Sequence, residues 1–158
     1  MKKIGIIIIL SVFFGCNGTA QKKETTNKFV ITKTKAEWKA ELTDLQFYVM
    51  REEGTERAFT SELNKNYSKG TYVCSACETP LFKSENKFDS GTGWPSFDEE
   101  IKGNVVYSEN GNAYYGIEEH CAVCGGHLGH IFNDGPKDTT GRRHCINGVS
   151  LKFIPENE

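Results

Sequence analysis

The sequence has 158 residues, of which 37% are hydrophobic and 25% charged, and its formal net charge is −2. This length suits one globular domain, and the composition excludes a membrane bundle and a disordered chain. No cluster of Lys and Arg stands apart from the carboxylates, which argues against a nucleic-acid partner. The 16 glycines against 4 prolines favour a turn-rich β fold.

An apolar run occupies residues 4–14, directly after Lys2 and Lys3. A bilayer span needs about 20 apolar residues, so this run has the length of a signal-peptide core instead. The sequence Gly-Cys at 15–16, followed by polar residues, resembles a bacterial lipoprotein signal. We therefore expect a signal peptide over 1–15, a lipid on Cys16, and export to the bacterial cell envelope as a membrane-anchored lipoprotein on the periplasmic or surface side. The alternative is a cleaved secretory signal with an incidental cysteine, which would also export the protein.

The segment after the lipid-bearing cysteine is polar, and we interpret residues 16–33 as a flexible tether ahead of a domain over 34–158. Helical spacing of four apolar residues predicts one helix from near Thr34 to Glu53, with Gly54 as its C-cap. Residues 58–64 could add a helical turn. The residues that set this spacing are Trp38, Leu42, Leu45 and Val49.

From Gly70 onward, short β-prone runs alternate with turn clusters. The dipeptide Asn110-Gly111 between two such runs predicts a hairpin. The pattern as a whole predicts a helix followed by a mostly antiparallel β domain. The predicted strands cover residues 71–73, 80–82, 105–107, 113–117 and 149–154.

Four of the six cysteines form two C-x-x-C pairs separated by 43 residues. Two such pairs supply four thiolates at tetrahedral reach, which predicts one structural Zn²⁺ per chain with no open position for water. Because the protein is expected to be exported, disulfides are the alternative, and a redox-active C-x-x-C is another. The predicted zinc ligands are Cys74, Cys77, Cys121 and Cys124.

This assignment leaves Cys145 as a free thiol in a segment with strand-like alternation. On a strand, Arg143, Cys145 and Asn147 share one face and Ile146 lies on the other. A guanidinium on the same face favours the thiolate and lowers its pKa, which predicts a nucleophilic cysteine. A strand whose arginine merely points to solvent is the alternative.

Two further segments carry residue types that suit catalysis. His127 and His130 are three residues apart, and Gly129 between them allows a bulge that would bring the rings together. Histidine is the natural proton donor near neutral pH. Trp94 lies in a loop made rigid by glycines and Pro95, where its ring could form the wall of a methyl pocket.

The segments 93–97, 126–132 and 143–147, together with both C-x-x-C pairs, resemble the signature blocks of B-type methionine-R-sulfoxide reductases, in the same order. The resemblance covers about residues 36–155. It implies a β-tent-like fold with two antiparallel sheets, reduction of methionine-R-sulfoxide, free or in proteins, and a thioredoxin-like reductant. It also implies that Cys145 attacks the substrate sulfur and becomes a sulfenic acid, that His127 and His130 donate to the oxygen, and that Trp94 packs the methyl group.

Within the resemblance, two positions of this chain differ from many relatives. Thr92 stands where they carry a second cysteine, so we expect an external thiol to reduce the sulfenic acid directly, rather than a zinc-binding cysteine. His144 stands where Tyr or Phe is common, and we expect little consequence because it faces away from Cys145. Two other functions remain open from the sequence: a zinc-ribbon-like binding module and a C-x-x-C thiol–disulfide oxidoreductase.

Overall fold

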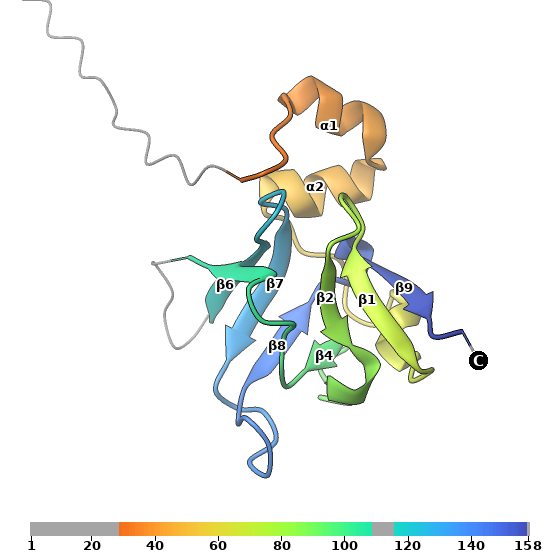
Figure 1. The fold of residues 1–158 in the computed structure, drawn as a ribbon, viewed down its shortest axis with the longest axis vertical. Coiled ribbons are helices and arrows are strands. Elements are labelled where there is room, and N and C mark those ends of the chain that lie inside the picture. Colours follow the sequence, from red (N-terminus) through yellow and green to blue (C-terminus); the bar gives the residue numbers. More distant parts are fainter. Residues whose placement is uncertain (1–28, 109–115, 158) are drawn as a thin grey trace, which may run out of the picture.

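The computed structural model describes residues 29–108 and 116–157 and places two helices at one end of two antiparallel sheets (Figure 1). The expected signal peptide, Cys16 and most of the expected tether lie outside these residues, as do Asn110 and Gly111. Among the described residues, no helix is both long enough and apolar enough to cross a membrane.

The smaller sheet has the strand order β2-β1-β9 and the larger one β3-β4-β8-β7-β6-β5. All neighbouring strands pair antiparallel, which confirms the expected mostly β fold with two sheets and a helical N-terminal part. The elements are α1 (Lys35–Glu41), α2 (Asp44–Glu52), the 3₁₀ turn η1 (Glu62–Lys65), β1 (Gly70–Cys74), β2 (Pro80–Lys83), the turn η2 (Ser84–Asn86), β3 (Lys87–Phe88), β4 (Ser96–Phe97), β5 (Val105–Tyr107), β6 (Ile117–Cys121), β7 (His127–Phe132), β8 (Arg143–Ile146), the turn η3 (Gly148–Ser150) and β9 (Leu151–Pro155).

An aromatic cluster joins the two sheets in the core. Phe97 of β4 stacks on Phe82 of β2, with ring centroids 4.4 Å apart, and meets Tyr72 of β1 edge-on at 4.9 Å. All three side chains are fully buried. Offset and edge-on contacts are the arrangements that aromatic rings prefer, so this cluster holds the sheets together in a fixed orientation.

The predicted single helix is two helices, because the chain turns at Thr43. Thr34 and Thr43 each cap a helix, and each receives the reciprocal side-chain contact of a capping box, from Glu37 and Gln46 respectively. The predicted C-cap was also wrong by one residue. Glu53 takes the left-handed conformation, with φ 56°, and a Cβ at Gly54 would lie 2.3 Å from the exposed Tyr48 ring, which would have to move aside.

The predicted strands over 71–73, 80–82, 105–107 and 149–154 correspond to β1, β2, β5 and β9. β9 begins two residues later than predicted, because residues 148–150 form a 3₁₀ turn, and the predicted turn at 58–64 is a 3₁₀ turn at 62–65. Residues 113–115 of the remaining predicted strand lie outside the described part of the chain. β5 does pair with β6, as the predicted hairpin requires, although its turn lies outside the described residues too.

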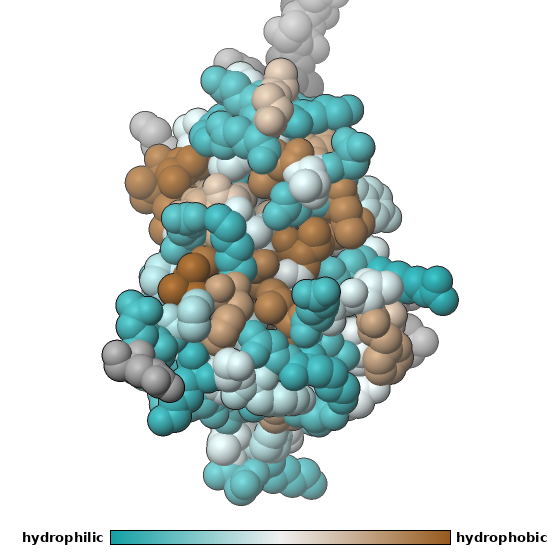
Figure 2. Space-filling view, turned by 90° about the vertical axis from the view of Figure 1, so that its right-hand side faces the viewer, coloured by the Kyte–Doolittle hydropathy of each residue, from teal (hydrophilic) through white to brown (hydrophobic). Residues whose placement is uncertain are grey.

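The middle of one face of the molecule is more apolar than the parts above and below it. Figure 2 shows apolar residues gathered over the middle of this face, with hydrophilic residues above and below. Some large hydrophobic side chains are well exposed in the fold, among them Leu45, Tyr48, Phe59 and Ile154. Isolated exposed apolar side chains are ordinary in folded proteins and do not by themselves define a site.

Candidate active site

A cleft of about 340 Å³ opens on the larger sheet, and Cys145 lies in its wall. Cys145 is on β8, between Ser96 of β4 and His130 of β7 as its cross-strand partners. The thiol is partly accessible, whereas its strand neighbours His144 and Ile146 are fully buried. The predicted alternation of faces along this strand is therefore confirmed. The cleft is lined by Thr55, Trp94, Gly129, His130, Phe132, Cys145 and Asn147.

Gly129 is required by the close approach of β7 to β8. A Cβ atom at this position would lie 2.0 Å from the carbonyl oxygen of Cys145. Real Cβ atoms do not approach backbone oxygen so closely, so only glycine lets the two strands meet beside the thiol. The glycine thus controls how near His130 comes to Cys145.

The guanidinium of Arg143 is held in place by Asp134, a residue that the sequence did not single out. The Nε and Nη2 atoms of Arg143 donate to the two carboxylate oxygens of Asp134, each over 2.8 Å. Its guanidinium also lies over the Phe132 ring, 4.3 Å from the centroid. A bidentate ion pair of this kind fixes the direction of the arginine as well as its charge.

The pKa of Cys145 does not fall as the sequence predicted. Burial raises the pKa of the thiol above its ordinary value, while hydrogen bonding to Thr92 and the charge of Arg143 lower it and offset only part of that rise. The prediction considered the nearby cation but not the loss of water around the sulfur, and desolvation disfavours the charged thiolate. The resting residue is therefore a thiol that has nearby groups able to stabilise its anion.

The two histidines converge as predicted, with ring centroids 5.4 Å apart, and the strand irregularity lies between them, where Leu128 is the extra residue of β7. The register between β6 and β7 shifts at Glu119 and His120, so that His120 lies opposite His127 instead of Leu128. Gly129 itself is in regular pairing. His130 lines the cleft, whereas His127 is 1% exposed and lies behind it.

Both histidines are kept from charging by their surroundings. Burial lowers the pKa of His127 and of His130 below the ordinary value. The Nδ1 atom of His127 lies 2.6 Å from the Oε1 atom of Glu118, and its Nε2 atom is buried without a hydrogen-bond partner among the described residues. A carboxylate on one ring nitrogen fixes which nitrogen carries the proton.

Glu56, also missed by sequence reasoning, fixes the side of the cleft formed by Trp94 and Asn147. Its carboxylate accepts hydrogen bonds from the backbone N–H groups of Gly148 (2.6 Å) and Val149 (2.9 Å). Its own N–H donates to Oδ1 of Asn147, and its carbonyl accepts from the indole of Trp94. Asn147 also donates to a β7 carbonyl, so both ends of its amide are already used within the protein.

Thr92 stands directly against the reactive sulfur. Its Oγ1 atom is 3.8 Å from the Sγ atom of Cys145. Behind it, hydroxyl contacts continue to Ser90 (2.8 Å) and from Ser90 to Ser96 (2.7 Å). A chain of hydroxyl groups therefore reaches the thiol from the loop that carries Trp94.

His144 points away from Cys145, as expected, but the structure places it in a buried cluster with two carboxyl groups. Its Nδ1 atom lies 2.5 Å from the carboxylate of Glu119 on β6, and both side chains are 0% exposed. Its Nε2 atom lies 3.3 Å from Glu100. Burial raises the pKa of Glu119, and contact with His144 offsets part of that rise. The expectation of little consequence overlooked this pairing, because Glu119 and His144 are distant in sequence.

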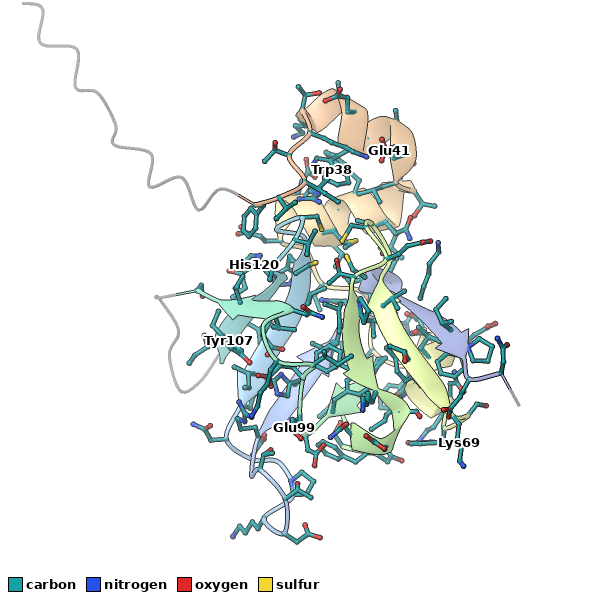
Figure 3. All side chains as sticks on the ribbon, viewed as in Figure 1. Trp38, Glu41, Lys69, Glu99, Tyr107 and His120 are labelled. Atoms are coloured by element: carbon teal, nitrogen blue, oxygen red, sulfur yellow. The ribbon has the colours of Figure 1, made fainter. Side chains whose placement is uncertain are left out.

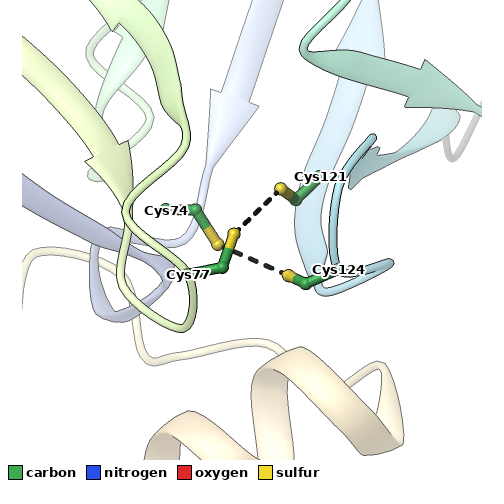
Figure 4. A group of neighbouring side chains, drawn as sticks. All are labelled: Cys74, Cys77, Cys121 and Cys124. Atoms are coloured by element: carbon green, nitrogen blue, oxygen red, sulfur yellow. Dashed lines mark hydrogen bonds between the residues drawn. The ribbon is translucent and has the colours of Figure 1, made fainter. Parts of the chain in front are cut away.

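The four predicted zinc ligands come together at the helix end of the sheets (Figure 4). The sulfur of Cys74 is 3.7 Å from that of Cys124, and the sulfur of Cys77 is 3.5 Å from that of Cys121. Tetrahedral Zn²⁺ with bonds of about 2.3 Å separates its sulfur ligands by roughly 3.8 Å. The cluster therefore fits a four-coordinate metal ion that would join the smaller sheet to the larger one.

The same distances contradict the disulfide alternative for these residues. A disulfide needs about 2.05 Å between sulfur atoms, and all five described cysteines are free thiols. The two C-x-x-C loops are also built alike. Glu78 (φ 61°) and Gly125 (φ 68°) take the left-handed conformation, and their N–H groups donate to the carbonyls of Cys74 and Cys121. Each loop thereby turns its thiols toward one centre.

Comparison with known proteins shows which family has this combination of sequence segments. The SelR domain matches residues 42–155, which hold α2, both sheets, Cys145 and the four-cysteine cluster. The chain belongs to the SelR domain family. A Leptospira interrogans protein named "Peptide methionine sulfoxide reductase MsrB" is 50% identical over 131 residues, which cover 81% of this chain and 98% of that protein.

The family is represented in all three domains of life by similar proteins. A relative of the same name from Methanosarcina mazei is 48% identical over 130 residues, covering 81% of this chain and 92% of its own length. The Arabidopsis thaliana protein named "Peptide methionine sulfoxide reductase B2, chloroplastic" is 46% identical over 128 residues, covering 80% of this chain and 63% of its own length. The similarity extends over nearly the whole described domain and is not confined to the cysteine pairs.

Proposed function

We propose that the protein reduces the R epimer of methionine sulfoxide, free or in proteins, with Cys145 as the nucleophile. The observation that carries this proposal is a partly accessible thiol in a cleft between an aromatic wall and a histidine, in a chain of the SelR domain family. The names of the relatives support the reaction, since they are called peptide methionine sulfoxide reductases. The enzyme is therefore an oxidoreductase that acts on oxidised methionine.

The proton needed for the reaction comes from the thiol itself. Because burial raises the pKa of Cys145 and lowers that of His130, the resting pair is a thiol and a neutral imidazole. Cys145 passes its proton by way of the histidine to the sulfoxide oxygen, a poor leaving group until it is protonated, while Arg143 stabilises the thiolate. The Cys145 sulfur attacks the substrate sulfur.

The electrons balance within this step. The bond between the two sulfur atoms then breaks as the protonated oxygen moves from the substrate sulfur to the Cys145 sulfur. The substrate sulfur is thereby reduced by two electrons to methionine, and the Cys145 sulfur is oxidised by the same two electrons to a sulfenic acid that holds the transferred oxygen and the proton. His127 lies behind His130 and supports it there, and the contact with Glu118 orients the His127 ring. Asn147 maintains the position of the segment after Cys145 through its bonds to Glu56 and β7.

The arrangement also supports a choice of epimer. A methyl group placed against Trp94 and an oxygen placed at His130 leave only one hand of the sulfur open to Cys145. Exchanging the methyl and oxygen would bring an apolar group to the histidine and leave the polar oxygen against the indole, where it lacks a donor. We assign the accepted hand as R from the family.

An external thiol reduces the sulfenic acid in this proposal. Thr92 lies against the Cys145 sulfur and cannot form a disulfide, and the four clustered cysteines are committed to the metal site. The first external thiol forms a mixed disulfide with Cys145 and releases water. The second restores the Cys145 thiol, and a thioredoxin-like dithiol supplies both.

We assign the metal at the four-cysteine cluster as Zn²⁺ in a structural role. Four thiolates at tetrahedral separation are its preferred closed ligand set, and they leave no position for water or substrate. Zinc would supply folding energy there and would take no part in the reaction.

We further propose that the protein is an exported lipoprotein of the bacterial envelope, anchored through Cys16. The order of charged, apolar and Gly-Cys segments over residues 2–16 supports this assignment. Cells fed a labelled fatty acid should incorporate the label into the protein and not into a Cys16→Ser variant. Equal labelling of both would refute the anchor.

The reductase proposal is tested with separated epimers of a blocked methionine sulfoxide and dithiothreitol. The full chain should consume the R epimer alone, and Cys145→Ser should abolish turnover. The control is Cys16→Ser, which should retain full activity. A substitution at Cys77 would not serve, because it alters the metal site. Turnover of neither epimer by the folded, zinc-containing protein would overturn the proposal.

A further inference from the structure

Three metal-binding side chains come together outside the four-cysteine cluster. Glu118 and His120 are two residues apart on β6 and therefore share a face of the strand, opposite to that of the buried Glu119. The register shift between β6 and β7 brings His127 directly opposite His120. One nitrogen or oxygen atom from each of the three lies within 4.8 Å of the other two. Figure 3 shows His120 on β6.

The distances within this group fit a small divalent ion. The Oε1 atom of Glu118 is 3.4 Å from Nε2 of His120 and 2.6 Å from Nδ1 of His127. Tetrahedral zinc with bonds of about 2.1 Å to nitrogen and oxygen separates its ligands by roughly 3.4 Å. Of the three separations, the one between Glu118 and His120 already has this value, and the one between Glu118 and His127 needs to open by less than about 1 Å. The third, between the two histidines, is within 4.8 Å.

The burial of the three side chains also suits an exchangeable ion. The side chain of His127 is 1% exposed, whereas those of His120 and Glu118 are 19% and 23% exposed. One ligand is therefore fixed in the protein, and two are partly exposed, so that an ion can reach them from solvent. Three protein ligands leave a fourth position for water, unlike the closed four-cysteine cluster.

We propose that Glu118, His120 and His127 form a second site, which binds one divalent transition-metal ion of the Zn²⁺, Co²⁺ or Ni²⁺ type, and that this ion inhibits the enzyme. Two imidazoles and a carboxylate are donors that such ions accept and that Mg²⁺ and Ca²⁺ do not favour. The ion binds to the Nδ1 atom of His127, and the Glu118 carboxylate then binds the ion instead of contacting that nitrogen directly. His127 then serves as a metal ligand and cannot support His130 in the cleft.

The inhibitory part rests on the proposed reductase function, whereas the binding part does not. Binding is therefore measured first, without any activity assay. The zinc-loaded full chain with Cys16→Ser and Cys145→Ser carries no thiol outside the four-cysteine cluster. Titration with Co²⁺ should give one equivalent with visible bands of a nitrogen and oxygen ligand set. These bands should lack the sulfur-to-metal absorption that cobalt in the four-cysteine cluster would show.

The variant His120→Gln removes a ligand that the proposed mechanism does not use. Because outer-shell partners alone contribute about tenfold to a hundredfold in metal affinity, loss of a direct ligand should weaken Co²⁺ binding by at least about tenfold. Glu118→Gln should weaken it as well, and Glu85→Gln, the same change at an exposed carboxylate on η2, should not. No binding beyond the four-cysteine cluster, or binding equal in His120→Gln, would overturn the site.

Inhibition is then measured in a single turnover, because thiol reductants would chelate the added ion. Prereduced protein with Cys145 intact is mixed with methionine-R-sulfoxide and Zn²⁺, and methionine is counted. The zinc concentration that halves the rate should be at least about tenfold lower for the parent than for His120→Gln. Equal slowing in both would overturn the inhibitory part. If neither protein forms methionine even without zinc, the reductase proposal fails while the Co²⁺ titration still decides the site.

Discussion

Replacement of His144 by phenylalanine tests whether the buried cluster behind the reactive strand is an ionic pair. The ring of His144 is 0% exposed and lies tilted against that of Phe82, with centroids 5.5 Å apart, so a phenyl ring fits the same apolar surroundings. The substitution removes the nitrogen that faces Glu119. A fully buried carboxylate is then left without its partner.

The expected loss follows from that burial. Removing one member of a buried ion pair costs about 3–5 kcal/mol, because the other charge stays in the interior uncompensated. The double variant Glu119→Val/His144→Phe removes both members, and such replacements are neutral or stabilising. We therefore expect His144→Phe to be less stable than the parent by several kcal/mol, and the double variant to recover most of that loss.

The loss should also depend on pH in a definite direction. Burial raises the pKa of Glu119, and losing His144 removes a contact that holds this pKa down. A carboxyl whose pKa is higher in the folded than in the unfolded protein binds more protons in the folded state. The stability of the folded protein therefore falls as pH rises. The deficit of His144→Phe should therefore be larger at pH 8 than at about pH 6, where the unpaired carboxyl is more readily protonated.

Urea unfolding of the parent, both single variants and the double variant gives the coupling between the two positions. Zinc content is measured throughout, because loss of the metal would also destabilise the fold. A single turnover of methionine sulfoxide should be retained, since His144 points away from the cleft. A coupling below about 0.5 kcal/mol, within the error of additivity, would show that the two side chains do not form the pair that the structure indicates.

Three further changes probe the site and the metal. Thr92→Cys places a thiol where Oγ1 now lies 3.8 Å from the Cys145 sulfur, so closing to a bond of about 2.05 Å needs a modest shift. One equivalent of sulfoxide should then produce an internal disulfide in the variant and a sulfenic acid in the parent, which mass spectrometry distinguishes. A variant that forms no disulfide between Cys145 and the new cysteine after turnover would contradict the geometry. Because burial raises the pKa of Cys145, its alkylation by iodoacetamide should still accelerate above about pH 8.5, where an ordinary thiol is half ionised. A rate that is constant between pH 6 and 8 would instead indicate a preformed thiolate. Cys77→Ser should lose the bound zinc and the cooperative unfolding transition together, as metal analysis and calorimetry would show, whereas retention of both would exclude a structural metal.

The features that the sequence predicted depend on spacing within a short segment. The alternation of Cys145 with Ile146 follows from the two-residue period of a strand, and the four-cysteine cluster follows from repeated C-x-x-C spacing. The break at Thr43 was also readable, because Thr43 and Gln46 have capping-box spacing. It was missed because Leu42 and Leu45 continue the apolar period across the break.

The features that the sequence did not predict depend on contacts between distant segments. Glu56 reaches the turn after Asn147 across more than 90 residues, and Glu119 meets His144 across 25. The raised pKa of Cys145 likewise reflects burial by the whole fold. Such pairings require the strand order and register, which the local pattern of one chain does not fix.

The alternation along β8 explains why neighbouring residues should respond to different assays. Cys145 lines the cleft and Arg143 interacts with its thiol, so substitutions at these two positions should change the reactivity of the thiol through charge and hydrogen bonding. His144 and Ile146 face the interior between the sheets, where changes should appear first in the free energy of unfolding. Gly129 belongs to both groups, since a side chain there would push β7 from the Cys145 carbonyl and move His130 with it. The strand pair thus joins the core directly to the reacting atoms, and the chemistry of Cys145 depends on the packing of the residues beside it.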